Sequence, residues 1–127
     1  MDVLIRYGFS IEEIKNMMDT NYLINNIEDN DIYTLIDILG SVGCMNNQIR
    51  NIFICNPFSL SRNTYEVSEL ISKLKEYGFS ELNYLFDSNP YILCLNSSDI
   101  ELLYNEKKNE SLSDEDFRDY INYNIIY

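Results

Sequence analysis

Two identical stretches, Tyr7-Gly8-Phe9-Ser10 and Tyr77-Gly78-Phe79-Ser80, lie 70 residues apart in this chain of 127 residues. A third glycine, Gly43, stands midway between them, so the three glycines are separated by two intervals of 35 residues. Glycine tolerates the left-handed backbone conformation that often follows the last turn of a helix. The stretches therefore predict three helix ends at a regular spacing, which is typical of a helical repeat.

An asparagine stands 11 or 13 residues after each of these glycines, at Asn21, Asn56 and Asn89, and the last two stand directly before proline. A residue before proline is disfavoured in the α conformation, so we expect Asn56 and Asn89 to end their helices. Each proline then begins a short turn, and we expect the leucine three residues after it, Leu60 or Leu93, to point into the core.

Between these signals, apolar residues recur at the three- and four-residue intervals of amphipathic helices, and no segment reads convincingly as a strand. Three pairs form the pattern of a helix capping box: Ser10 with Glu13, Ser98 with Glu101, and Ser113 with Asp116. We expect one all-α domain over residues 1–127, built as a short helical-repeat solenoid of about three ~35-residue units closed by a C-terminal capping helix. The expected units are about 1–39, 40–74 and 75–104, followed by a loop over 105–112 and the capping helix over about 113–127.

A unit of helix, Gly-Phe-Ser, helix, Asn-Pro-x-x-Leu and helix resembles the repeat of the mitochondrial transcription termination factor (mTERF) family. The resemblance covers about residues 1–104 and departs from the pattern at Tyr22, where the first unit lacks the proline. It implies a curved all-helical solenoid with a basic surface that binds double-stranded nucleic acid. The residues that carry it are Tyr7-Gly8-Phe9-Ser10, Asn56-Pro57-Phe58-Ser59-Leu60, Tyr77-Gly78-Phe79-Ser80 and Asn89-Pro90-Tyr91-Ile92-Leu93.

The charge of the chain argues against such a basic surface. The sequence has 9 Lys and Arg against 21 Asp and Glu, for a net charge of −12. Nucleic-acid binders normally carry a positive footprint. We therefore expect a non-catalytic interaction protein whose acids mimic a phosphate backbone and bind a basic, nucleic-acid-handling protein as an inhibitor, as anti-CRISPR or DNA-mimic proteins do. The candidate partner-binding acids are Glu28, Asp29, Asp31, Asp114, Asp116 and Asp119.

Other interpretations of the same residues stay open. The acids can serve only solubility and helix capping, since they cluster where helices are expected to begin. Direct nucleic-acid binding in the mTERF manner would use a concave basic face, and a third possibility is a structural subunit of a larger assembly. The candidate bases for nucleic acid are Arg50, Arg62, Lys73 and Lys75.

Catalysis, metal binding and cofactor binding all lack a motif in this sequence. No histidine is present to activate a nucleophile, and no glycine-rich phosphate loop occurs. The pairs Asp29-x-Asp31 and Asp114-x-Asp116 lack the glycine and closing glutamate of a calcium loop. We therefore expect no enzyme activity, no metal and no cofactor.

The remaining expectations concern cysteines, location and the C-terminal tail. Cys44, Cys55 and Cys94 have no Cys-x-x-Cys spacing, and we expect buried thiols. The N-terminus lacks a targeting pattern and no apolar run reaches the ~20 residues of a membrane span, so we expect a cytoplasmic protein without a membrane partner. The apolar tail over 120–127 either caps the last unit or forms an interface, and the oligomeric state stays open.

Overall fold

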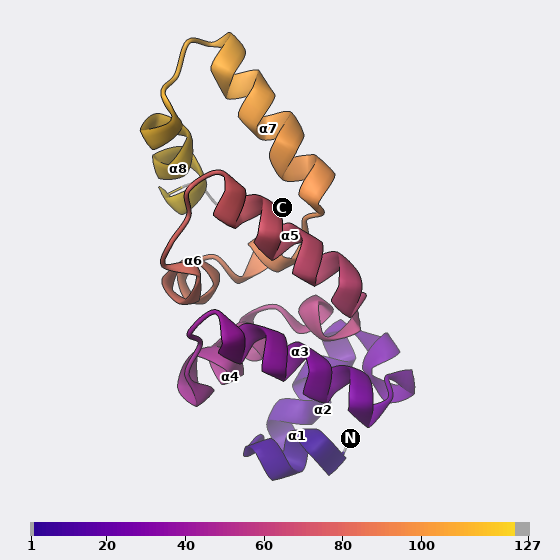
Figure 1. Cartoon of the computed structure of the whole chain (residues 1–127). Helices are drawn as coiled ribbons and strands as arrows, with labels where there is room; N and C mark the ends of the chain where they lie inside the picture. The colour runs from indigo at the N-terminus through magenta and orange to yellow at the C-terminus, as the bar shows by residue number, and fades with distance from the viewer. Residues whose placement is uncertain (1, 124–127) are drawn as a thin grey trace.

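The computed structural model describes residues 2–123 and is all-α, with no strand in that range (Figure 1). Short 3₁₀ helices, η1 to η3, alternate with pairs of α-helices. The α-helices are α1 (Asp2–Tyr7), α2 (Ile11–Thr20), α3 (Asp29–Ser41), α4 (Asn46–Cys55), α5 (Thr64–Glu76), α6 (Leu82–Ser88), α7 (Ser97–Asn109) and α8 (Asp114–Tyr123). The 3₁₀ helices are η1 (Tyr22–Asn26), η2 (Pro57–Ser61) and η3 (Pro90–Cys94).

Helices in the same place of this order pack on one another. Helix α1 packs on α3, α3 on α5 and α5 on α7, and Figure 1 shows α3, α5 and α7 side by side with similar directions. In the same way α2 packs on α4 and α4 on α6, while η1 packs on η2 and η2 on η3. Helix α8 turns back and packs on α7. Elements that occupy the same place in the recurring order therefore lie next to one another in rows.

The three glycines end helices as expected, at Gly8 (φ +108°), Gly43 (φ +95°) and Gly78 (φ +91°). After each one, the next backbone N–H donates to a carbonyl five residues back, for example Phe79 N to Leu74 O at 3.1 Å. This bond and the shorter one made by the glycine N–H satisfy carbonyls that the helix end leaves free, as in a Schellman motif. A fourth end of this kind lies at Ser111 (φ +65°), where Leu112 N donates to Lys107 O at 3.1 Å.

The asparagines that close α2, α4 and α6 are buried and reach into the next part of the chain. Asn21 donates through Nδ2 to the carbonyl of Pro57 at 3.1 Å, and Asn56 donates to that of Pro90 at 2.9 Å. Asn89 donates to the carbonyl of Asn122 at 2.9 Å. Because each donor and acceptor lie more than 30 residues apart, these bonds fix the register between successive elements.

Most of the local expectations are confirmed. Asn56 and Asn89 end their helices, Pro57 and Pro90 begin 3₁₀ helices, and Leu60 and Leu93 are buried in the core. Two of the three expected capping boxes form: Glu13 N donates to Ser10 Oγ at 3.0 Å, and Asp116 N donates to Ser113 Oγ at 3.1 Å. The box expected at Ser98 with Glu101 is wrong, because α7 begins two residues earlier and its box joins Asn96 with Asp99.

Two further expectations are wrong, and one reaches past the described chain. The loop over 105–112 is mostly helix, because α7 continues to Asn109 and is closed by the cap at Ser111. Cys55 and Cys94 are exposed and only Cys44 is buried. The expected capping helix corresponds to α8, whereas residues 124–127 of that expectation lie outside the described residues.

Candidate partner-binding surface

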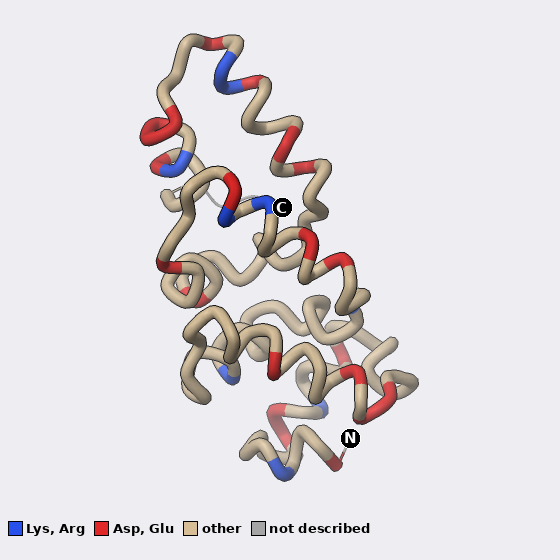
Figure 2. Tube along the Cα trace, viewed as in Figure 1, with Lys and Arg blue, Asp and Glu red and all other residues tan. Residues whose placement is uncertain are grey.

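The six acids expected to bind a partner do not form one face. Glu28 stands at the N-cap of α3, and Asp29 and Asp31 lie in its first turn. The other three, Asp114, Asp116 and Asp119, belong to α8. Figure 2 shows that the start of α3 and helix α8 lie at opposite ends of the molecule. The six acids therefore form two separate groups on the surface.

Two of the three α8 acids already have partners within the chain. Asp114 accepts hydrogen bonds from Lys108 Nζ at 2.6 Å and from the Tyr104 hydroxyl at 2.8 Å. The hydrogen bond from Lys108 has the larger effect and that from Tyr104 the smaller, and together they hold the pKa of the Asp114 carboxyl below its ordinary value. Asp116 accepts from Ser113 N at 3.2 Å and so caps α8. These two acids therefore help to hold and start α8, whereas Asp119 is exposed and makes no such bond among the described residues.

The bases expected to touch nucleic acid are mostly neutralised by neighbours. Arg50 on α4 lies 3.5 Å from the Glu13 carboxylate and stacks over the Phe9 ring, with its guanidinium carbon 5.5 Å from the ring centre. Lys73 on α5 lies 2.9 Å from Glu76. Lys75 alone of the four candidates has no acidic partner in the described chain. These bases therefore offer little free positive charge to a phosphate backbone.

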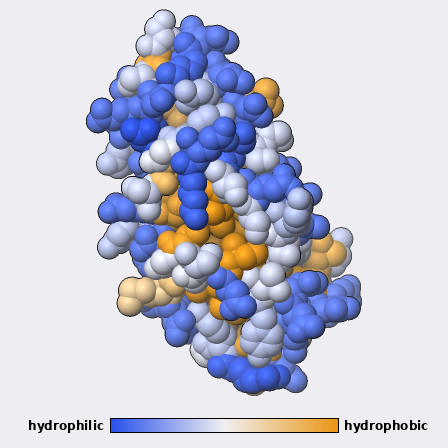
Figure 3. Space-filling model, viewed as in Figure 1, coloured by the Kyte–Doolittle hydropathy of each residue, from blue (hydrophilic) through white to orange (hydrophobic). Residues whose placement is uncertain are grey.

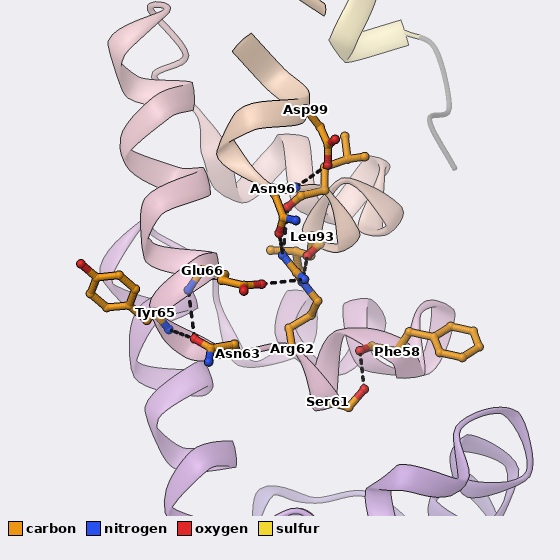
Figure 4. A network of polar contacts seen from close by, with 10 residues as sticks. Phe58, Ser61, Arg62, Asn63, Tyr65, Glu66, Leu93, Asn96 and Asp99 are labelled. Atoms are coloured by element: carbon orange, nitrogen blue, oxygen red, sulfur yellow. Dashed lines mark hydrogen bonds and ion pairs between the residues drawn. The ribbon is translucent and has the colours of Figure 1, made fainter. Parts of the chain in front are cut away.

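Arg62, the fourth candidate base, joins two parts of the fold (Figure 4). It follows η2, and its guanidinium donates to the carbonyls of Leu93 at 2.9 Å and Leu95 at 3.1 Å. It also donates to Asn96 Oδ1 at 2.6 Å and forms an ion pair with Glu66 at 3.2 Å. Because Nε, Nη1 and Nη2 of the guanidinium all donate to groups of the same chain, Arg62 connects η2 with η3 and with the start of α7.

A groove between α5 and α7 carries acids that the sequence interpretation missed. Glu69 and Glu101 line it and form no ion pair among the described residues, whereas Glu76 pairs with Lys73. Hydrogen bonding to Glu76 raises the pKa of Lys73, and the negative charge of Glu101 raises it further. We call this surface the α5–α7 groove. Its lining residues are Tyr65, Ser68, Glu69, Ser72, Lys73, Glu76, Ser97, Ser98 and Glu101.

The surroundings of the groove are polar and accessible. Figure 3 shows hydrophilic side chains over α5 and α7, whereas apolar side chains gather between α3 and α5. Tyr65 at one end of the groove is 73% exposed. A tyrosine beside free carboxylates provides contact area and hydrogen bonding for a partner that brings positive charge.

Part of this surface has a signal in the sequence. Glu66, Glu69, Lys73 and Glu76 follow one another at intervals of three and four residues, which places them on one side of a helix. The apolar residues Val67, Leu70, Ile71 and Leu74 occupy the other side and are buried. The position of α7 beside these acids depends on packing between elements that are more than 20 residues apart in the chain. A pattern of residue spacing within one helix cannot predict such packing.

No group of three or more His, Cys, Asp or Glu side chains within residues 2–123 could hold a metal ion. None of the helices described is long and apolar enough to cross a membrane. Comparison of the chain with family models, with curated proteins and with solved structures gives no match.

Proposed function

We propose that this chain is a non-catalytic, acidic interaction protein that binds a basic, nucleic-acid-handling protein as an inhibitor or nucleic-acid mimic. The observation that carries the proposal is the internal pairing of its few bases. Arg50, Arg62, Lys73, Lys107 and Lys108 each form an ion pair with an acid of the same chain, which leaves the excess acids to dominate the surface. The α5–α7 groove is the binding surface that we propose.

The physical basis is electrostatic steering. Uncompensated carboxylates in a groove attract a cationic partner and raise the rate of association, and this attraction weakens as salt is added. Glu69 of α5 and Glu101 of α7 line the groove and form no ion pair among the described residues, and the Lys73 ammonium in the same groove is paired with Glu76. A basic helix or an extended basic segment would place its charges between α5 and α7.

We propose in addition that the helices form a short solenoid of about three mTERF-like units, with α8 as the capping helix. The support is the recurrence of the same helix end at Gly8, Gly43 and Gly78, and the row packing of like helices. The register bonds of Asn21 and Asn56 add to it. A stack of this kind exposes its rows as long faces, which suits an extended partner.

The test compares charge reversals inside and outside the groove. The probe is a fluorescently labelled peptide of alternating Lys and Ala, titrated with the protein at about 50 and 150 mM salt. We expect the double variant Glu69→Lys/Glu101→Lys to weaken binding by about tenfold or more, because two free carboxylates are replaced by repelling charges.

The matched control is Asp37→Lys/Glu115→Lys, which changes the net charge equally through exposed acids on α3 and α8. We expect the control to weaken binding by no more than about twofold at the higher salt, since distant charges are screened. Equal weakening by both variants would mean that the peptide senses net charge only and would reject the groove. Asp29→Lys/Asp31→Lys in the same titration tests the acids at the start of α3.

A further inference from the structure

An apolar groove lies at the end of the molecule opposite α8, between α1 and α2. Its lining is almost wholly apolar except for Lys15 and Asp19 at its edge, and Ile5 and Ile11 are 53% and 78% exposed. Large apolar side chains left open together in this way mark an interaction site. The lining residues are Ile5, Ile11, Ile14, Lys15, Met18 and Asp19.

The matching face of α4 shows what covers such a groove. Counted back from the asparagine that closes each helix, Ile11, Lys15 and Met18 of α2 correspond to Asn46, Arg50 and Phe53 of α4. These α4 residues contact the segment that runs from the end of α1 to the first turn of α2. Tyr7 donates to Asn46 at 2.7 Å, Glu13 pairs with Arg50 at 3.5 Å, and Phe9 stacks on Phe53 with ring centres 6.3 Å apart.

The residues at the α2 groove lack these partners. Phe53 and Phe86 are completely buried, whereas Met18 in the same place on α2 is only partly buried. Lys15, in the place of Arg50, has no acidic partner in the described chain. An occupant of the groove should therefore bring an apolar side chain to Met18 and a carboxylate to Lys15.

The start of α8 carries this pair of groups in the same arrangement as the start of α2. Ser111-Leu112-Ser113 takes the place of Gly8-Phe9-Ser10, with the same left-handed helix end before it. Asp116 accepts from Ser113 N at 3.2 Å, as Glu13 accepts from Ser10 N at 2.8 Å. Asp116 is exposed and Leu112 is only partly buried, so both are accessible to another molecule.

We propose that the chain associates head to tail with a second copy of itself, the start of α8 of one copy filling the α2 groove of the next. In this contact Asp116 pairs with Lys15, and Leu112 covers Met18, in the manner of Glu13 with Arg50 and Phe9 with Phe53. The two surfaces differ, so each copy keeps one of them free and the assembly grows by addition at its ends. Burial of Ile5, Ile11 and Met18 drives the contact against the repulsion between two acidic chains, which salt screens.

The test measures mass against concentration by sedimentation of the full chain at about 150 mM salt, where charges more than ~8 Å apart are screened. We expect the average mass to rise above the 15.0 kDa of one chain as concentration increases. Lys15→Glu alone and Asp116→Lys alone should each reduce this rise, because either change places like charges across the contact. Lys75→Glu on α5 and Asp37→Lys on α3 are matched controls on exposed residues outside both surfaces and should associate as the unaltered chain does.

A mixture of the two single variants gives the sharpest outcome. The Lys15→Glu variant keeps Asp116 and the Asp116→Lys variant keeps Lys15, so one junction between them restores the original pair. The other junction places the new lysine at position 116 against the new glutamate at position 15, which is also an attractive pair. Equal amounts should therefore associate more strongly than either variant alone, which a folding defect cannot produce. A constant mass of 15.0 kDa for the unaltered chain, or a mixture that behaves as the sum of its parts, would overturn the proposal.

Discussion

The three cysteines differ in what surrounds their sulfur atoms. Cys44 follows Gly43 and is buried, and this burial, with the negative charge of Asp87, raises its pKa to about 11. Cys55 and Cys94 are exposed. Sequence alone favoured buried thiols for all three, since free cysteine is among the most buried residue types. The exposure of the other two depends on where the ends of α4 and η3 meet solvent, which their neighbours in sequence do not determine.

We expect two of the three thiols to react with Ellman's reagent in the native protein at pH 8. With a pKa of about 11, Cys44 is only about one part in a thousand thiolate at that pH, and its burial blocks access besides. The third thiol should react only after denaturant is added, which also provides the control count. Three equally fast thiols in the native protein would contradict the burial of Cys44.

Ser111 offers a test at the level of a helix end. It adopts φ +65°, which favours glycine, in the place where the other helix ends have glycine. Relief of the strain on a side chain there exceeds the extra flexibility that glycine brings to the unfolded chain. We expect Ser111→Gly to raise the free energy of unfolding by roughly 0.5–1 kcal/mol in urea denaturation.

The reverse exchange at Gly78 is the matched control. A Cβ there would lie 2.8 Å from Nη1 of Arg118, which donates to the Tyr77 carbonyl at 3.1 Å. Gly78→Ser should therefore lower the free energy of unfolding by about 1–2 kcal/mol or more. A loss of stability on Ser111→Gly would show that the serine side chain contributes more than its backbone strain costs.

The contact between successive elements is tested at Asn56. Its Nδ2 donates to the Pro90 carbonyl at 2.9 Å in a buried site, and it also contacts Cys94 Sγ at 3.3 Å. Asn56→Ala leaves a buried carbonyl without its donor, so we expect a loss of about 1–3 kcal/mol of stability by urea denaturation. Asn47→Ala on the exposed side of α4 should change stability by less than about 0.5 kcal/mol. Equal effects at the two positions would argue against the register bond.

Local signals predicted elements well and contacts between elements poorly. The helix ends at Gly43, Asn56 and Asn89 follow from backbone preferences of single residues, which is why the sequence contains them. The length of α7 was missed because Lys107, Lys108 and Asn109 continue the helix without an apolar pattern. The α5–α7 groove was missed for another reason, because it forms only when α5 and α7 pack together. The acids proposed from the sequence were selected because they are close together along the chain.

At the scale of the whole molecule, the distribution of charge separates the possible partners. Acids appear at both ends and along α5 and α7, and bases are scattered among them (Figure 2). Concave faces that hold nucleic acid need clustered Lys and Arg whose charges are free to replace counterions. Here Lys75 is the only one of the four expected bases that has no internal acidic partner in the described chain. We therefore expect a basic protein to bind this surface and a phosphate backbone to be repelled by it.

We expect no saturable binding of labelled duplex DNA, single-stranded DNA or RNA, measured by fluorescence anisotropy at about 50 and about 200 mM salt. A chain of net charge −12 repels the phosphate backbone, and at low salt this repulsion is at its strongest. The quadruple variant Glu66→Gln/Glu69→Gln/Glu76→Gln/Glu101→Gln is a useful comparison, because it removes the ion-pair partners of Arg62 and Lys73 and the acids of the α5–α7 groove. If this variant gains salt-sensitive binding that the unaltered chain lacks, the glutamates are what exclude nucleic acid. Saturable binding by the unaltered chain that weakens with salt would instead support the mTERF-like function and reject the acidic interaction surface.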